Sequence, residues 1–385
     1  MTSAALSIGF RPFYFLAAAF AALAVPLWFA AYGGWLPLTP ALPAFLWHAH
    51  EMVFGFAPAV IVGFLLTAVR NWTGRPTPSG AALAALALLW LAGRVAMLTG
   101  PGTAAALIDV AFLPVAAVVL AVPLARSRNA RNAFVVPLLL LLGGLAALHH
   151  AAYSGLVSGA WLTRAGTAAM DLVALLLTVI GGRVIPNFSA NAVPGLTPRR
   201  WAAVEWGTIA GVGLIVLLDV SGAAGSLPMP ALRALFFTVA ALQCLRLLGW
   251  QPWKTRRNVL LLVLPLGYLW LPVHFALRGM LDAVPGQMAQ PALHALAVGA
   301  MAGLMLAMMT RSARGHTGRP LVAGGAEVFM FTAIHLAALV RVGGVLLWPA
   351  GYVTWVGAAA VLWSLAFGAF AVRYAPILAR PRADA

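Results

Sequence analysis

The sequence has one cysteine, one lysine and very few charged residues of any kind. Because Cys244 is alone, an intrachain disulfide and any cysteine-based iron–sulfur or zinc site are excluded. Only 8% of the 385 residues are charged, whereas 63% are hydrophobic. Soluble domains of this length do not have such a composition, and long apolar runs recur from end to end. We therefore expect a polytopic membrane protein.

The apolar runs also lack the alternation of polar and apolar residues that marks a barrel strand. The run from Ala133 to Leu148, for example, is almost continuously apolar. Because lipid leaves only helices or closed barrels as spanning structures, we predict an all-α fold with twelve transmembrane helices in a single domain, residues 1–385. The predicted spans are Phe10–Tyr32, Ala44–Val69, Ala81–Leu98, Ala104–Val122, Ala133–Tyr153, Leu162–Ile185, Ala202–Val220, Pro230–Leu248, Val259–Leu277, Gln287–Thr310, Val328–Leu347 and Tyr352–Tyr374.

Acidic residues are scarce, so the formal net charge is +16, and nearly all of the positive charge is arginine. The arginines gather in the loops after even-numbered spans, as Arg126, Arg128 and Arg131 do, whereas the loops after odd-numbered spans are short and mostly uncharged. The positive-inside rule then places both termini in the cytoplasm. Since the basic residues follow the topology, they indicate no nucleic-acid surface.

With this orientation, seven of the eight histidines fall in the outer half of the membrane. Only His316 lies in a cytoplasmic loop. An ionisable group inside a membrane is costly, and neutral imidazole is the commonest protein ligand for metals such as iron and copper. A single histidine could be an interface anchor or bond to a carbonyl, but a whole layer favours a shared metal site. The seven are His48, His50, His149, His150, His274, His294 and His335.

Two of these histidines begin segments with the same spacing. Glycine follows His50 at five residues, arginine at twenty, and a Thr-Gly-Arg-Pro tetrapeptide begins at twenty-three; the same three features follow His294 at the same distances. Spans two and ten therefore resemble copies of one unit that cross the membrane in the same direction. We predict that His50 and His294 face each other at equal depth and bind one haem iron from both sides.

The remaining histidines suggest a second metal. His48 is about 200° around the helix from His50, so it points to another metal or to the interface. His150 with His274 and His335 could supply a copper site. His149 is a further candidate, although adjacent helical residues diverge by about 100° and one of the pair is expected to ligate.

Five arginines depart from the cytoplasmic bias and lie at the depth of the histidines: Arg94, Arg164, Arg233, Arg278 and Arg341. Guanidinium groups pair well with carboxylates. They could therefore bind haem propionates, or they could pair with the protein's own carboxylates. The acidic residues on the predicted outer side are mostly Asp109, Asp171, Asp219 and Asp282. Glu51 follows His50 directly and could orient its imidazole or handle a proton.

The stretch from Gly181 to Pro186 interrupts span six near its cytoplasmic end. Two glycines followed by a proline predict an irregular turn there. No Lys-Ser or Lys-Thr pair follows, so the stretch is no phosphate loop.

Several separated blocks, in order, resemble the NnrS family over nearly the whole chain. The resemblance implies a bacterial cytoplasmic-membrane protein that contains haem b and copper and takes part in the response to nitric oxide during denitrification or nitrosative stress. The blocks are Ile8-Gly9-Phe10-Arg11-Pro12-Phe13, Trp47-His48-Ala49-His50-Glu51-Met52, Asn71-Trp72-Thr73-Gly74-Arg75-Pro76, Gly181-Gly182-Arg183-Val184-Ile185-Pro186 and Gly315-His316-Thr317-Gly318-Arg319-Pro320.

The layout is also similar to the catalytic subunit of haem–copper oxidases, with twelve spans and histidines on spans two and ten. That family's copper ligands on spans six and seven and its histidine pair on span ten are missing here. The expected function is a haem- and copper-binding protein, with nitric oxide or a related species as ligand or substrate and an electron donor as partner. If histidine fills both axial positions, the haem transfers electrons and an open copper reacts. The alternative is a twelve-span transporter of a small solute.

Overall fold

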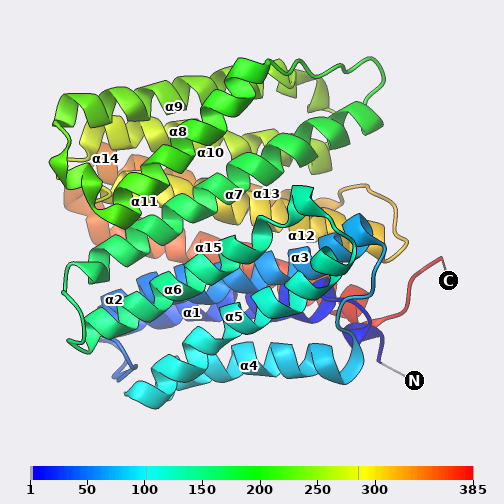
Figure 1. The fold of residues 1–385 in the computed structure, drawn as a ribbon. Coiled ribbons are helices and arrows are strands. Elements are labelled where there is room, and N and C mark those ends of the chain that lie inside the picture. Colours follow the sequence, from blue (N-terminus) through cyan, green and yellow to red (C-terminus); the bar gives the residue numbers. More distant parts are fainter. Residues whose placement is uncertain (1–2, 101, 285, 385) are drawn as a thin grey trace. The chain divides into compact units, whose positions relative to one another are not determined.

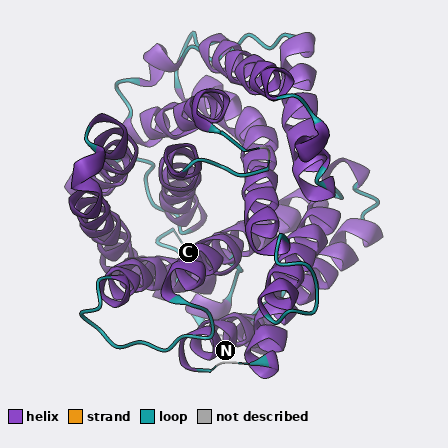
Figure 2. Cartoon of the chain, turned by 90° about the vertical axis from the view of Figure 1, so that its left-hand side faces the viewer, coloured by secondary structure: helices purple, strands orange, loops and turns teal. Residues whose placement is uncertain are grey.

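The computed structural model describes residues 3–100, 102–284 and 286–384. Within these ranges the chain forms helices and connecting loops and no strands (Figure 2). Twelve helices are long and apolar enough to cross a membrane, and each matches one predicted span to within several residues. The predicted all-α, multi-pass membrane fold is therefore confirmed.

The first compact unit, unit 1, comprises residues 1–162, 309–320 and 367–385. It holds most of the N-terminal helices, together with the end of α12 and the end of α15 (Figure 1). Its complete helices are α1 (Phe10–Tyr32), α2 (Ala44–His50), α3 (Ala57–Thr73), α4 (Gly80–Thr99), α5 (Thr103–Arg126) and α6 (Val135–Tyr153).

The second compact unit, unit 2, comprises residues 163–308 and 321–366. The prediction of a single domain, 1–385, is not tested by this division and stays a prediction. The helices that lie wholly or partly in unit 2 are α7 (Trp161–Ala192), α8 (Ala202–Ser221), α9 (Met229–Gly249), α10 (Val259–Leu281), α11 (Gln290–His294), α12 (Gly303–His316), α13 (Gly325–Leu339), α14 (Val345–Leu347) and α15 (Tyr352–Ala379).

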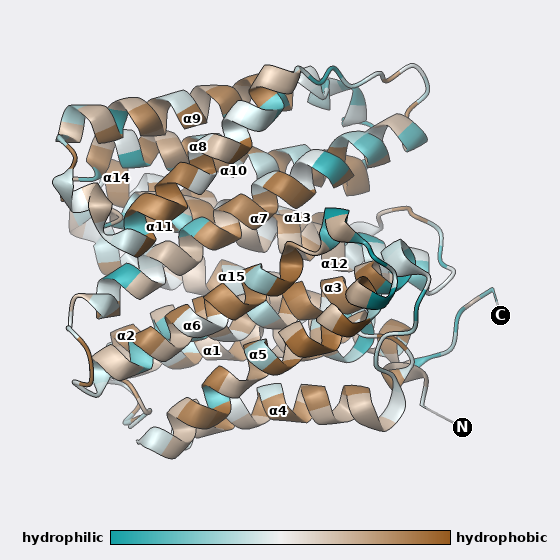
Figure 3. Ribbon diagram, viewed as in Figure 1, coloured by the Kyte–Doolittle hydropathy of each residue, from teal (hydrophilic) through white to brown (hydrophobic). Residues whose placement is uncertain are grey.

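Helix packing in each unit follows the rules of membrane interiors. In unit 1, α5 packs against α3, α4 and α6, and α1 packs against α3; in unit 2, α9 packs against α8 and α10 (Figure 1). Small side chains such as Ala17, Ala18 and Ala21 are fully buried and allow helices to approach closely. Hydrophobic residues run along the labelled helices (Figure 3), and large ones such as Leu88 and Leu217 are exposed. Those exposed side chains are suited to lipid rather than water.

Three segments of the described ranges are π-helical. One, Glu51–Phe56, begins directly after His50, and another, Ala295–Ala302, begins directly after His294. The third is Val340–Gly344, between α13 and α14. Isolated π-helical turns inside helices are frequent at functional sites. Spans two and ten thus share a π-helical turn at the same position after a histidine. Their origin as copies of one unit stays a prediction. The cytoplasmic placement of both termini also stays a prediction.

Candidate metal centre

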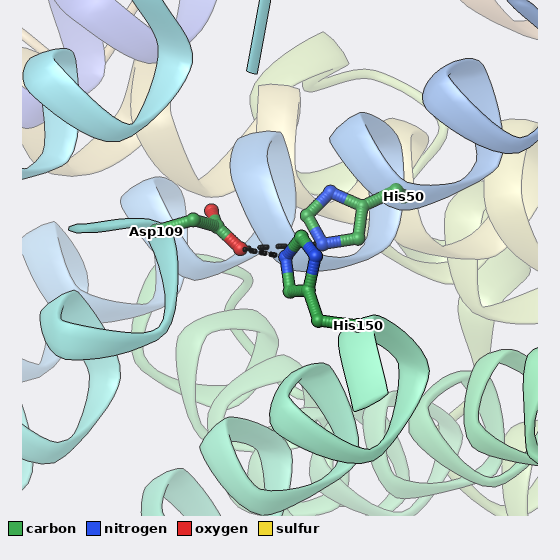
Figure 4. Close-up of side chains that lie close together, drawn as sticks. All are labelled: His50, Asp109 and His150. Atoms are coloured by element: carbon green, nitrogen blue, oxygen red, sulfur yellow. Dashed lines mark hydrogen bonds and ion pairs between the residues drawn. The ribbon is translucent and has the colours of Figure 1, made fainter. Parts of the chain in front are cut away.

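Three buried side chains of unit 1 come together as a cluster that could hold a metal ion. His50 ends α2, Asp109 lies in α5 and His150 lies in α6. One ligand atom from each falls within 4.8 Å of the other two (Figure 4). Asp109 Oδ2 lies 3.2 Å from His50 Nε2 and 2.9 Å from His150 Nε2. We refer to these three residues as the His-Asp-His cluster.

A guanidinium holds the carboxylates around this cluster. Arg94 Nη1 donates to Glu51 Oε1 at 2.6 Å, and Arg94 Nη2 pairs with Asp109 Oδ1. Glu51 Oε1 in turn lies 3.3 Å from His50 Nδ1. For Arg94, the structure therefore shows pairing with the protein's own carboxylates, which was one of the two predicted alternatives.

The charges of this site do not balance when the imidazoles are neutral. Two carboxylates, Glu51 and Asp109, face one guanidinium, Arg94, so one negative charge is left over. Each of these three residues is at most 6% exposed. An uncompensated charge is costly in so buried a position. This excess charge can be compensated by a proton on an imidazole or a carboxylate, or by a metal cation.

Glycine at position 55 makes the arrangement possible. A Cβ atom there would overlap Nη1 of Arg94 and crowd Glu51 Oε2. The Gly55 carbonyl also accepts a hydrogen bond from Trp90 Nε1 at 2.9 Å. Since Gly55 lies within the π-helical turn after His50, the turn and the missing side chain together bring Arg94 beside Glu51.

The other two predicted ligands of unit 1, His48 and His149, are not part of the cluster. The His149 ring is 5.3 Å from the His50 ring, and its buried Nδ1 has no hydrogen-bond partner. His48 stacks on Trp28 with ring centroids 3.9 Å apart. The cluster thus uses His150 rather than its neighbour, and His48 points away from His50, as its position on the helix predicted.

Unit 2 holds the remaining three predicted ligands. Nδ1 of His274 lies 2.8 Å from the Ala292 carbonyl, and Nδ1 of His294 lies 2.8 Å from the Gln290 carbonyl. A carbonyl can only accept, so both rings carry their proton on Nδ1 and present the Nε2 lone pair. His335 differs, because its Nδ1 accepts from Trp270 Nε1 at 3.3 Å and its proton is therefore on Nε2.

The pairing of His50 with His294 on one iron is not tested. His50 belongs to unit 1 and His294 to unit 2, and the same division separates His150 from His274 and His335. Both shared sites stay predictions.

Arg278 is the centre of a second carboxylate cluster, in unit 2. Its guanidinium contacts Asp171 Oδ1 at 2.9 Å, Asp219 Oδ2 at 3.1 Å and Asp282 Oδ2 at 2.9 Å. All four side chains are almost fully buried. For Arg278, too, the structure shows carboxylate pairing. Among the residues that the structure describes, no carboxylate lies at ion-pair distance from Arg341, which contacts Tyr352 and Gln290 instead.

A third polar network lies elsewhere in unit 2 and was not predicted. Arg246 binds Glu205 through two contacts of 2.9 and 2.5 Å and donates to the Tyr268 hydroxyl at 3.0 Å. Tyr268 donates to Gln243, which donates to Thr178 Oγ1 at 2.9 Å. These residues come from four helices, α7 to α10, so no local spacing reveals the network.

The polar network around Arg246 explains why two glycines lie near the end of span six. The prediction of an irregular turn at these glycines is wrong. Helix α7 continues unbroken through the glycines and Pro186 to Ala192. A Cβ atom on Gly182 would overlap the Arg246 guanidinium, and one on Gly181 would lie 3.2 Å from the Tyr268 ring. The two glycines therefore serve close packing rather than a change of direction.

Asp109 is the member of the His-Asp-His cluster that the sequence did not predict as a candidate ligand. It was predicted only as a partner for arginine. The available signal was a carboxylate within an otherwise apolar span, which by itself suggests a functional site. What the sequence could not show is that α5 places this carboxylate against two imidazoles from α2 and α6.

The comparison with known families agrees with the blocks found in the sequence. The family model described as NnrS protein matches residues 4–382, which is nearly the whole chain. The search of curated proteins found no match to the chain. Since one family model covers both compact units and all twelve spans, the chain belongs to the NnrS family.

Proposed function

We propose that this chain is a haem- and copper-binding protein of the bacterial cytoplasmic membrane that acts in the response to nitric oxide. Family membership supports the nitric oxide context. The observation that carries the metal assignment is the buried His-Asp-His cluster with its excess negative charge. We place copper there, in the predicted outer half of the membrane.

The two separations between Asp109 and the histidine nitrogens match the spacing of ligand atoms around a single small ion. Metal–nitrogen and metal–oxygen bonds of roughly 2.0–2.2 Å place neighbouring ligand atoms about 2.9–3.5 Å apart. The separations of 3.2 and 2.9 Å from Asp109 Oδ2 fall at this spacing. His50 Nε2 is buried and makes no aligned hydrogen bond, so its lone pair is open to a metal. Imidazole suits copper, and a monovalent copper ion would bring the local charge to zero.

Haem fits this cluster poorly, because a porphyrin is far wider than the gap between His50 and Asp109. In place of the predicted iron shared by His50 and His294, we therefore assign haem b to an imidazole of unit 2. His294 and His274 both carry the oriented Nε2 lone pair that an axial ligand requires. His294 is preferred, since the sequence also singles it out by spacing.

Bound haem and copper would supply one-electron chemistry and a binding position for nitric oxide or a related species. The chain's own groups prepare the copper position. Glu51 accepts the Nδ1 proton of His50 and so orients its ring, and Arg94 holds Glu51 and Asp109 in place. The proposed activity is oxidoreduction, which also requires an electron donor.

Metal analysis and an optical spectrum of the purified protein test this assignment. Protein from cells supplied with haem and copper is expected to contain both. His150→Ala and Asp109→Asn should lower copper content at least about tenfold and leave the haem spectrum unchanged. Cys244→Ser is the control, because Cys244 is exposed and could bind copper adventitiously. A wild-type protein that is colourless and free of copper would contradict the proposal.

Transport of a small solute is the second candidate. It is favoured by the buried network of Thr178, Gln243 and Tyr268, because transporters place polar groups within the membrane. The hydrogen bonds of these three residues join members of the network to one another, which is more typical of a structural core. Solute uptake by metal-free protein in vesicles would support transport instead.

A further inference from the structure

Arg341 is a buried cation with neutral partners. It is 5% exposed and lies in the π-helical turn Val340–Gly344. Nη2 donates to the Tyr352 hydroxyl at 3.3 Å and to Gln290 Oε1 at 3.5 Å. Nη1 is buried and has no hydrogen-bond partner. Within the described ranges, no carboxylate lies at ion-pair distance from it, whereas Arg94, Arg246 and Arg278 each bind at least one.

An unpaired guanidinium in such a place is costly. Buried charges in proteins are paired or hydrogen-bonded, and an unsatisfied donor loses its hydration without compensation. The long contact of 3.5 Å to Gln290 contributes little. The site therefore lacks one negative charge and at least one acceptor.

We propose that Arg341 binds a planar anion with two oxygen atoms, of the carboxylate or nitrite type. Guanidinium presents paired N–H groups that match two such oxygens. Nη1 is available for one of them. Tyr352 accepts from Nη2 through its oxygen, so its own O–H remains to donate to the anion.

Gln290 connects this anion site to a predicted haem ligand. Its side-chain oxygen faces Arg341, and its backbone carbonyl accepts the Nδ1 proton of His294. The anion would therefore lie in the same part of unit 2 as the His294 ring. Two sources share the required chemistry: a propionate of haem, or free nitrite. The choice between these sources rests on the proposed function, but the anion site itself does not.

The test measures anion binding and haem properties on the same protein in lipid nanodiscs. Formate and nitrite are the probes, and calorimetry measures their binding. The variants are Arg341→Gln, Arg341→Lys and Tyr352→Phe. Arg233→Gln is the matched control, since Arg233 is another arginine of the predicted outer side but is exposed on α9.

If the anion is free, the wild type binds both probes and Arg341→Gln weakens them about tenfold or more. If the anion is a haem propionate, the haem-loaded wild type binds neither probe, and Arg341→Gln moves the haem midpoint potential to a more negative value because a positive charge is lost. Both results support the site, provided that Arg233→Gln matches the wild type. If Arg341→Gln does not fold, Arg341→Lys and Tyr352→Phe are expected to show the same changes at smaller size.

Unchanged probe binding, haem content and haem potential in the Arg341 variants would overturn the proposal, as would haem-free protein that binds neither probe. Failure of the proposed function is separate from this result. It would appear as absent copper and haem, and formate binding could still be measured.

Discussion

His50 and His150 both direct Nε2 towards one atom, Oδ2 of Asp109, at 3.2 and 2.9 Å. Their ring centroids are only 4.8 Å apart, although the residues are a hundred positions apart in the chain. A proton on either imidazole, or a metal cation between the three groups, would compensate the buried carboxylate, so this arrangement makes the cluster a candidate cation site. Asp109 is therefore the residue that both histidine rings contact through Nε2.

Replacing Glu51 by glutamine is expected to weaken copper binding about 10- to 100-fold. Glu51 Oε1 lies 3.3 Å from His50 Nδ1, so the carboxylate orients the ring and increases its basicity. Competition with a chelator of known copper affinity measures the change. Glu327→Gln is the control, because its amide oxygen can still accept from the Gly324 amide and it lies in unit 2. Equal affinities for Glu51→Gln and wild type would exclude a role of Glu51 in positioning.

Gly55→Ala is expected to lower the free energy of unfolding by about 2–4 kcal/mol. The added methyl group would occupy the position of Arg94 Nη1 and separate the guanidinium from Glu51. Thermal unfolding in detergent, followed by circular dichroism, measures the loss. Gly144→Ala in α6 is the matched control, since a Cβ atom there meets nothing within 4 Å. Because alanine is the better helix former, the control should gain about 0.5–1 kcal/mol. Equal stability of the two variants would argue against the close approach of Arg94.

Gly182→Ala tests the corresponding close approach in unit 2. Its methyl group would displace the Arg246 guanidinium, which bonds to Glu205 and Tyr268. We expect a loss of about 2–4 kcal/mol in the free energy of unfolding and unchanged copper content. Gly213→Ala in α8, where nothing lies within 4 Å, is the control. An irregular turn at Gly182 would instead make both substitutions similarly mild.

The carboxylate cluster of unit 2 is expected to lose stability when its cation is removed but not when one of its anions is removed. Arg278→Met leaves three buried carboxylates together and should cost at least about 3–5 kcal/mol, so that little protein is recovered from membranes. Asp171→Asn brings the cluster closer to neutrality, and an amide at the unpartnered Oδ2 position can donate to Asp219. Its yield and melting temperature should match the wild type. Similar damage from both substitutions would contradict this charge count.

The sequence predicted the fold well because lipid imposes a strong rule on composition. Each span must be apolar over about 20 residues, so its presence is visible in the chain itself. The ends were less predictable. Span six was expected to stop near Ile185, but α7 continues to Ala192, since Gly181 and Gly182 pack against Arg246 and Tyr268 rather than ending the helix.

The candidate site was predicted only in part. The histidine pattern marked His50 and His150 as ligands, and the scarcity of charge marked every buried arginine as notable. The third donor, Asp109, was not recognised. Likewise, the sequence could not distinguish Arg94, which pairs with two carboxylates, from Arg341, which pairs with none in the part of the chain that the structure describes. Such differences depend on neighbours from distant parts of the chain.

The sequence by itself determined that this is an all-helical protein with twelve apolar spans, because hydropathy is a property of single segments. The tertiary structure decided which imidazoles meet a carboxylate, which tautomer each adopts and which arginine is left without an anion. The reason is that a charged side chain inside a membrane is compensated by groups from other helices, and only the tertiary structure brings those helices together.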